Sequence, residues 1–122
     1  MARILVVDDS PTETEAFRSM LEKNGHQVLT AENGADGVEV ARREKPDVVL
    51  MDIVMPGLNG FQATRQLTKD PSTQHIPVII VTTKDQETDR VWGKRQGAKD
   101  YLTKPVDEDL LINTIKQHIN VS

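Results

Sequence analysis

Five short apolar runs, separated by segments with helical patterning, constrain this fold most strongly. Each run is too short for a core helix, so we expect strands. The first, third and fourth contain only apolar residues, which is typical of strands buried on both faces of a parallel sheet. The runs are residues 4–7, 28–30, 48–51, 78–81 and 101–102.

Helix-start signals lie between these runs. Ser10-Pro11-Thr12-Glu13 has an N-cap residue, a proline at the first helical position and a glutamate at the third, and Asn24-Gly25 ends this helix. Strict alternation of strand and helix predicts an α/β fold of the (βα)5 type, a doubly wound five-stranded parallel sheet with right-handed crossovers. The other predicted helices are capped by Asn33, Asn59, Asp85 and Asp107 and end near Glu44, Thr68, Gln96 and Ile119.

Length and charge narrow the class of function. At 122 residues we expect one domain that uses the whole chain, 1–122, with no room for an attached output domain. The net charge of -4 gives no basic footprint, which argues against nucleic acid as a partner. The start of the chain resembles neither a signal peptide nor a membrane span, and the lack of cysteine suits a reducing compartment. We therefore expect a cytoplasmic protein without membrane insertion.

Three carboxylates follow predicted strands directly: Asp8 and Asp9 after the first, and Asp52 after the third. Ligands of open α/β sheets bind at the carboxyl ends of strands, where the strand order reverses. If the order is 2-1-3-4-5, the first and third strands are neighbours about 4.8 Å apart, and the three acids converge. Such a cluster either raises its pKa values or binds a hard cation, and we favour Mg²⁺.

Thr82 and Lys104 end the fourth and fifth predicted strands at the same edge of the sheet. The Thr82 hydroxyl could donate to a phosphoryl oxygen, and the Lys104 ammonium could bring positive charge to it. Metal-holding carboxylates, an attacking Asp52, a lysine and a hydroxyl supply the positioning and electrostatics that phosphoryl transfer needs. The product would be an acyl phosphate on Asp52.

These motifs resemble the receiver-domain family of two-component systems, in particular its CheY-like single-domain members. The resemblance covers essentially the whole chain, and the stretches 46–70 and 76–107 look most like the PilH-type regulators of type IV pilus twitching motility in bacteria. Because the motifs are well separated along the chain, their agreement makes the resemblance specific. The motifs are Asp8-Asp9, the run from Met51 to Gly57, Thr82, and Lys104-Pro105.

The resemblance implies a role for each of these positions. Asp52 would be the phosphoacceptor, Asp9 and Asp52 direct metal ligands, Asp8 a ligand acting largely through water, and the Val54 carbonyl the third protein ligand. Thr82 would be the switch hydroxyl, Lys104 the phosphate-binding cation, and Tyr101 the aromatic whose rotamer reports the state. The Lys104–Pro105 peptide would be cis.

The same resemblance implies the partners of a monomeric response regulator. A histidine kinase or phosphotransfer domain would supply the phosphoryl group. A protein target would bind the face formed by residues 85–96, 101–102 and 107–119, which includes Trp92. The alternative is a phosphate sink that drains a shared kinase, and sequence does not choose between them.

Two positions depart from CheY: Val54 stands where a polar residue is usual, and Lys84 where an acid is usual. A hydrolytic water would have fewer polar partners, so we expect slower autodephosphorylation than in CheY.

Three other functions compete with the receiver. They are a haloacid-dehalogenase-type phosphatase, which would need an Asp-x-Asp spacing, a flavodoxin-like cofactor binder, which would need a hydroxyl- and glycine-rich loop, and an interaction module independent of phosphorylation.

Overall fold

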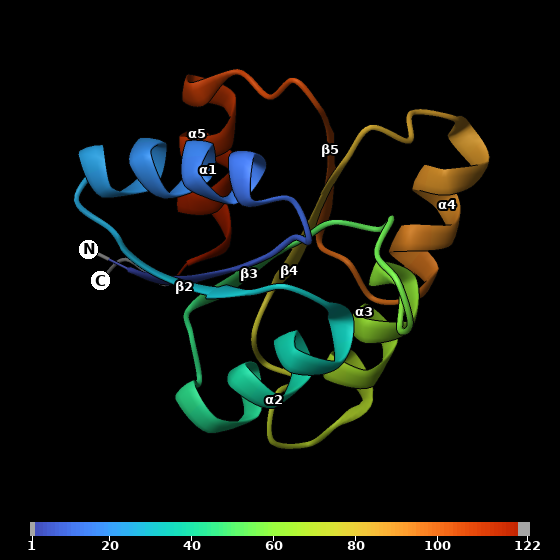
Figure 1. Cartoon of the computed structure of the whole chain (residues 1–122). Helices are drawn as coiled ribbons and strands as arrows, with labels where there is room; N and C mark the ends of the chain where they lie inside the picture. The colour runs from blue at the N-terminus through green and yellow to red at the C-terminus, as the bar shows by residue number, and fades with distance from the viewer. Residues whose placement is uncertain (1, 120–122) are drawn as a thin grey trace.

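The computed structural model describes residues 2–119 and shows five strands alternating with five helices (Figure 1). The predicted α/β class and strand-helix alternation are confirmed. In chain order the elements are β1 (Arg3–Val7), α1 (Pro11–Lys23), β2 (Gln27–Ala31), α2 (Gly34–Glu44), β3 (Val48–Met51), α3 (Gly60–Lys69), β4 (Val78–Thr82), α4 (Glu87–Arg95), β5 (Asp100–Thr103) and α5 (Glu108–His118).

The sheet has the order β2-β1-β3-β4-β5, and every neighbouring pair is parallel. The order 2-1-3-4-5 is therefore confirmed. In the register of the central pair, Val7 lies opposite Met51, so β1 and β3 end side by side. Because Asp8 and Asp52 follow these two residues, the strand register alone brings both acids to one point of the sheet edge.

Apolar side chains fill both faces of the sheet because its central strands are buried throughout. Ile4 and Val6 of β1 point to the layer of α1 and α5, whereas Leu5 and Val7 point to the layer of α2 and α3, as the two-residue period of a strand requires. A smaller cluster includes Ile80 and Tyr101. This two-sided burial holds the carboxyl edge of the sheet rigid under the acids.

Helix starts follow the predicted caps with one exception. Ser10 accepts from the Glu13 N–H, Asn33 from Asp36, Asn59 from Gln62 and Asp107 from Leu110. The prediction that Asp85 caps the fourth helix is wrong: the N-cap of α4 is Gln86, which makes no side-chain cap hydrogen bond. On α1, Phe17 and Leu21 are buried, whereas Ala16 is exposed.

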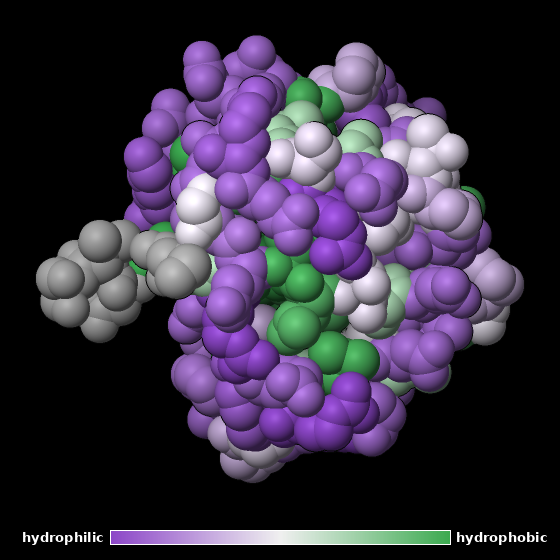
Figure 2. Space-filling model, turned by 60° about the vertical axis from the view of Figure 1, so that its left-hand side comes forward, coloured by the Kyte–Doolittle hydropathy of each residue, from purple (hydrophilic) through white to green (hydrophobic). Residues whose placement is uncertain are grey.

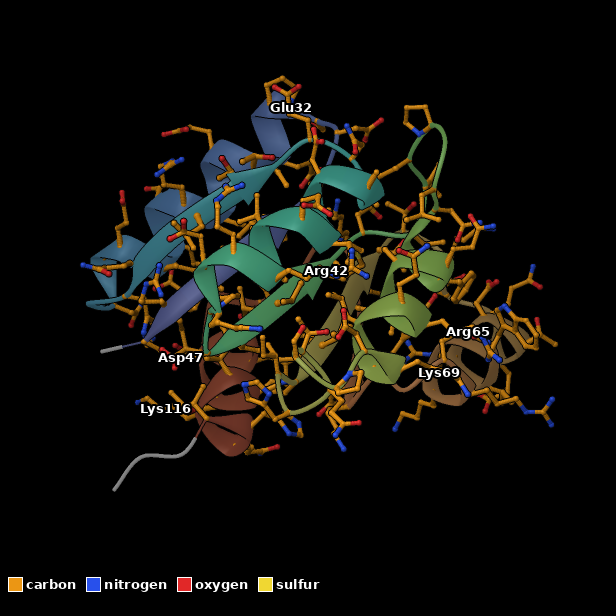
Figure 3. The ribbon with its side chains drawn as sticks, turned by 90° about the horizontal axis from the view of Figure 1, so that it is seen from below. Glu32, Arg42, Asp47, Arg65, Lys69 and Lys116 are labelled. Carbon is orange, nitrogen blue, oxygen red and sulfur yellow. The ribbon has the colours of Figure 1, made fainter. Side chains whose placement is uncertain are left out.

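The surface beside these layers is largely hydrophilic. Figure 2 shows a mainly hydrophilic face crossed by a narrow apolar strip. Figure 3 shows Arg65 and Lys69 on α3, beside α4. There the Arg65 guanidinium lies 3.4 Å from Gln96 Oε1, and the Thr68 hydroxyl donates to the Gln96 carbonyl at 2.6 Å. Between residues 2 and 119, no helix has the length and apolar character needed to cross a membrane.

Candidate functional site

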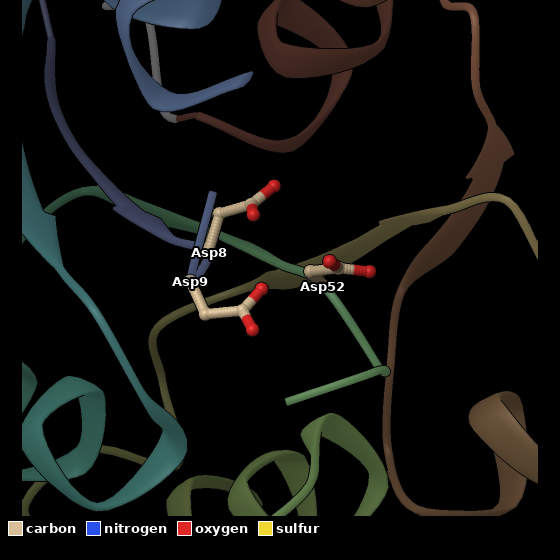
Figure 4. Close-up of side chains that lie close together, drawn as sticks. All are labelled: Asp8, Asp9 and Asp52. Atoms are coloured by element: carbon tan, nitrogen blue, oxygen red, sulfur yellow. The ribbon is translucent and has the colours of Figure 1, made fainter. Parts of the chain in front are cut away.

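Three carboxylates meet at the carboxyl edge of the sheet. One oxygen from each of Asp8, Asp9 and Asp52 lies within 4.8 Å of the others (Figure 4). Asp8 and Asp52 are buried, whereas Asp9 is exposed. Within residues 2–119, the Asp9 carboxylate makes no hydrogen bond or ion pair, so its oxygens are free to bind a cation.

Lys104 brings a single buried positive charge to this cluster. Its Nζ lies 2.8 Å from Asp8 Oδ2 and 3.6 Å from Asp52 Oδ2, and only 9 % of its side chain is exposed. Glu13 Oε2 lies 3.8 Å from the same ammonium, and the Phe17 ring centroid 5.8 Å. The three aspartates outnumber the one ammonium, and Glu13 adds a further acid beside it, which is a charge balance that suits a divalent cation.

The pKa values of these groups reflect burial and mutual charge. Burial raises the pKa of Asp52, and the charge of Asp8 adds to the rise, while Lys104, the Ile53 N–H and the Thr82 hydroxyl oppose it. Burial by itself lowers the pKa of Lys104, but the hydrogen bond to Asp8 and the charges of Asp52 and Asp8 raise it overall. The lysine is thus held as a cation among the carboxylates.

Local hydrogen bonds fix where the acids point. Asp52 Oδ1 accepts from the Ile53 N–H at 2.8 Å, and Asp8 Oδ1 accepts from the Ser10 N–H at 2.9 Å. The second oxygen of each carboxylate faces Lys104. The segment after Asp52 is also tightly packed, because a Cβ on Gly60 would clash with the Asp52 carbonyl oxygen. The backbone and the carboxylate of Asp52 are therefore both held in place.

Thr82 and Tyr101 lie on one hydrogen-bonded path leading away from the acids. Thr82, at the end of β4, is fully buried, and its Oγ1 accepts from the Lys84 N–H at 3.4 Å. The Lys84 carbonyl in turn accepts from the Tyr101 hydroxyl at 2.7 Å. Tyr101 itself is 4 % exposed, and burial raises its pKa to about 12. A single residue, Lys84, thus connects the two side chains.

Two further candidate residues have exposed side chains. Trp92 lies on α4 with half of its surface exposed, and the Val54 side chain is also exposed. The Lys104–Pro105 peptide is cis. Sequence reasoning missed Glu13 and Phe17 as neighbours of Lys104. Their place on the first helix, next to Asp8 and Asp9, was a signal that could have suggested this.

The family comparison matches the description "Response regulator receiver domain" over residues 4–116. The chain therefore belongs to the receiver-domain family of response regulators. It is also 80% identical to Protein PilH of Pseudomonas aeruginosa over 115 residues, which is 94% of this chain and 95% of that protein. The predicted resemblance to PilH-type receivers is confirmed.

Solved structures resemble the fold closely. The chemotaxis protein CheY4 of Vibrio cholerae superposes with a TM-score of 0.91 at 28% identity, covering 98% of this chain and 99% of that one. The receiver domain of the sensor histidine kinase PA1611 from Pseudomonas aeruginosa has a TM-score of 0.89 at 30% identity, with 96% of each chain covered. That structure is described as holding a magnesium ion in its active site cleft.

Proposed function

We propose that this chain is a stand-alone receiver that accepts a phosphoryl group on Asp52 from a histidine kinase or phosphotransfer domain. The observation that carries the proposal is the position of Asp52 beside Asp8, Asp9 and Lys104. Its buried carboxylate lies at the carboxyl edge of the sheet together with two further acids, and the Lys104 ammonium lies 3.6 Å from its Oδ2. This arrangement supports both attack on phosphorus and neutralisation of the transferred group.

The proposed step forms one bond and breaks one. The free oxygen of Asp52 attacks phosphorus, a P–O bond forms, and the P–N bond to the imidazole of the donor breaks. The imidazole keeps the electron pair and takes up a proton. Lys104 Nζ, 3.6 Å from Asp52 Oδ2, lies close enough to pair with the oxygens of the new acyl phosphate, and Thr82 would donate to another.

The acidic cluster fits Mg²⁺, a hard cation that accepts few protein oxygens and keeps several waters. Asp9 and Asp52 would bind it directly, Asp8 largely through water, and the Val54 carbonyl would complete the set of protein ligands. When bound, the ion would neutralise charge on the transferred oxygens. The exposed and unpaired carboxylate of Asp9 supports this assignment, as does the excess of acids over bases in the crevice.

A groove of about 380 Å³ beside α1 is suited to the phosphodonor. Phe17 and Met20 supply apolar surface, and Lys104 also lines the groove. A donor helix seated on the apolar part could bring its histidine to the acidic crevice. Output would use the face of α4, β5 and α5, where Trp92 and Tyr101 lie. A phosphate sink is the alternative outcome of the same chemistry.

We also propose a role in type IV pilus twitching motility, which the 80% identity to Protein PilH supports. A monomeric protein in the cytoplasm is part of the same proposal. Binding of a target only after phosphorylation would indicate an effector. If instead the protein drains phosphoryl groups from a kinase without binding a target, it is a sink. Pull-downs with and without a phosphoryl mimic distinguish the two.

The central test is incubation with Mg²⁺ and acetyl phosphate, followed by intact-mass measurement and site mapping. We expect one adduct, on Asp52, and none in Asp52→Asn. Asp85→Asn is the matched control, because Asp85 is an exposed acid after β4 and should leave the adduct unchanged. An undiminished adduct in Asp52→Asn would overturn the proposal, and continuous turnover of small phosphate esters would indicate a phosphatase instead.

The lifetime of the adduct should exceed that of CheY because Val54 and Lys84 offer a hydrolytic water few polar partners. Both side chains are exposed. Val54→Asn restores a polar side chain and should shorten the lifetime, measured as loss of the adduct after the phosphodonor is removed. A lifetime in the unaltered chain equal to or shorter than that of CheY contradicts this reasoning.

A further inference from the structure

Tyr101 is held in its buried position from three directions. Its hydroxyl donates to the Lys84 carbonyl at 2.7 Å. One edge of the ring lies against α4, where a Cβ on Gly93 would come within 3.1 Å of Tyr101 Cδ2. The third contact is the Arg90 guanidinium, whose Cζ lies 5.2 Å from the ring centroid. With any larger residue at position 93, the ring would have to move away from the helix by a few tenths of an ångström.

Arg90 contacts both the ring and the backbone of Tyr101. While its Cζ lies over the ring, its Nη1 donates to the Tyr101 carbonyl at 3.3 Å. A planar guanidinium can stack and donate at the same time, whereas a lysine ammonium has no planar fork to do both. Arg90 therefore connects α4 to β5 through Tyr101, whose hydroxyl also contacts the loop after Thr82.

A solvated surface arginine would be the ordinary explanation for Arg90, and its surroundings argue against it. Glu87 lies one turn earlier on α4, at the spacing that favours an ion pair, and Asp89 is adjacent. Nevertheless, in the part of the chain that the structure describes, Arg90 forms no ion pair within 4.0 Å. Its contacts go to Tyr101 instead.

The contact between Arg90 and Tyr101 forms part of the wall of a groove between α4 and β5. Arg90, Lys94 and Tyr101 line it together with Glu87, Val91 and Asp100, and its volume is about 240 Å³. If the Tyr101 ring left its buried position, Arg90 would lose its contact with the ring but keep its donor position at the Tyr101 backbone carbonyl, and the wall of the groove would change. We propose that Arg90 is a positioning residue that keeps Tyr101 buried and thereby sets the shape of the α4–β5 groove. Its importance for signalling rests on the proposed function of that face.

The test measures how often Tyr101 becomes accessible. It is the only tyrosine of the chain, so O-acetylation by N-acetylimidazole, reversed by hydroxylamine, reports on this side chain alone. In Arg90→Ala we expect the acetylation rate to rise about two- to fivefold, as loss of a cation–π contact at a partly exposed site would produce. Arg90→Lys, which keeps the charge without the planar fork, should give an intermediate rate.

Arg95→Ala is the matched control, because Arg95 ends the same helix and is exposed. Its acetylation rate should equal that of the unaltered chain. All rates are taken well below the thermal midpoint, followed by circular dichroism. If Arg90→Ala is too unstable, Arg90→Met retains the aliphatic cover and should still raise the rate. Equal rates in the unaltered chain and in the folded Arg90 variants overturn the proposal. Since no phosphodonor is used, failure of Asp52 phosphorylation leaves this result unaffected.

Discussion

Two buried threonines should respond in opposite ways to the same substitution. Thr64 and Thr73 are both fully buried, but only one has a hydrogen-bond partner. Thr64 Oγ1 has none among the residues that the structure describes. Thr73 Oγ1 donates to the Leu67 carbonyl at 2.7 Å. The Leu67 carbonyl lies in the last turn of α3, where the residue four positions on is Pro71, which has no N–H to donate.

Replacing either threonine by valine keeps the shape and β-branching of the side chain and removes only the hydroxyl. Thr64→Val removes an unpaired buried hydroxyl and should stabilise the fold by about 1–2 kcal/mol. Thr73→Val leaves the Leu67 carbonyl without its donor and should destabilise by about 1–3 kcal/mol. For a chain of this length each kcal/mol corresponds to about 4 °C in the thermal midpoint. The two variants should therefore differ by roughly 8–20 °C in midpoint.

Urea unfolding followed by Trp92 fluorescence and by circular dichroism measures both changes. Trp92 is the only tryptophan and lies on α4, away from both substitutions in sequence. Since the m-value depends on the surface exposed, it should be unchanged, so a shift in the urea midpoint reports on stability. Destabilisation by both variants, or no difference between them, would refute the argument from hydrogen-bond satisfaction.

Four further outcomes are expected. Burial raises the pKa of Tyr101 to about 12, so the buried neutral tyrosine stabilises the fold fully below its ordinary pKa of about 10, and this stabilisation is lost as the pH rises towards 12. Tyrosinate absorbance measures the titration, and a midpoint near 10 in the folded chain would contradict this prediction. Hydrogen bonds from the Ser72 N–H and from Arg42 lower the pKa of Asp70 to about 2. The ionised carboxylate therefore stabilises the fold above its ordinary pKa, and this effect is lost as the pH falls through 2. NMR titration of the carboxyl should show a midpoint well below 3.8. Mg²⁺ at about 100 times its Kd should add about 2.7 kcal/mol to the free energy of unfolding, less in Asp52→Asn, as urea titrations with and without EDTA would show. Gly60→Ala should destabilise by about 1–3 kcal/mol, because its Cβ would clash with the Asp52 carbonyl oxygen, and equal urea midpoints would contradict this.

The sequence predicted a helix start correctly where only one residue was a good N-cap candidate. Asp107 is a short polar residue just before an apolar periodic stretch, and it caps α5 as predicted. Asp85 failed as a cap because residues 85–89 contain several polar candidates, and α4 begins after Gln86. Helix starts are thus predictable from local chemistry when that chemistry offers one choice, and ambiguous when it offers several.

The approach of distant acids was predictable for a different reason. Parallel strands end at one edge of a sheet, so the strand order and a carboxylate after each strand brought Asp8 and Asp52 together. Which oxygen pairs with Lys104, and that Asp8 lies closer to it than Asp52, depends on differences of about an ångström that no sequence pattern encodes. The contact between Arg90 and Tyr101 depends on the rotation of α4 about its own axis, which the low apolar content of that helix leaves undetermined.

Because the strand order joins residues far apart in the chain, we expect the site to form late in folding. Asp8 follows β1, Asp52 follows β3 and Lys104 follows β5, and Lys104 and Asp8 are separated by 96 residues. Contacts this distant in sequence close only after large loops are ordered, so they belong to the slow end of folding. A nascent or partly unfolded chain therefore has the acids but not the crevice. Under the proposed function, only molecules that have completed the sheet would accept a phosphoryl group. Incompletely folded chains would therefore take no part in signalling.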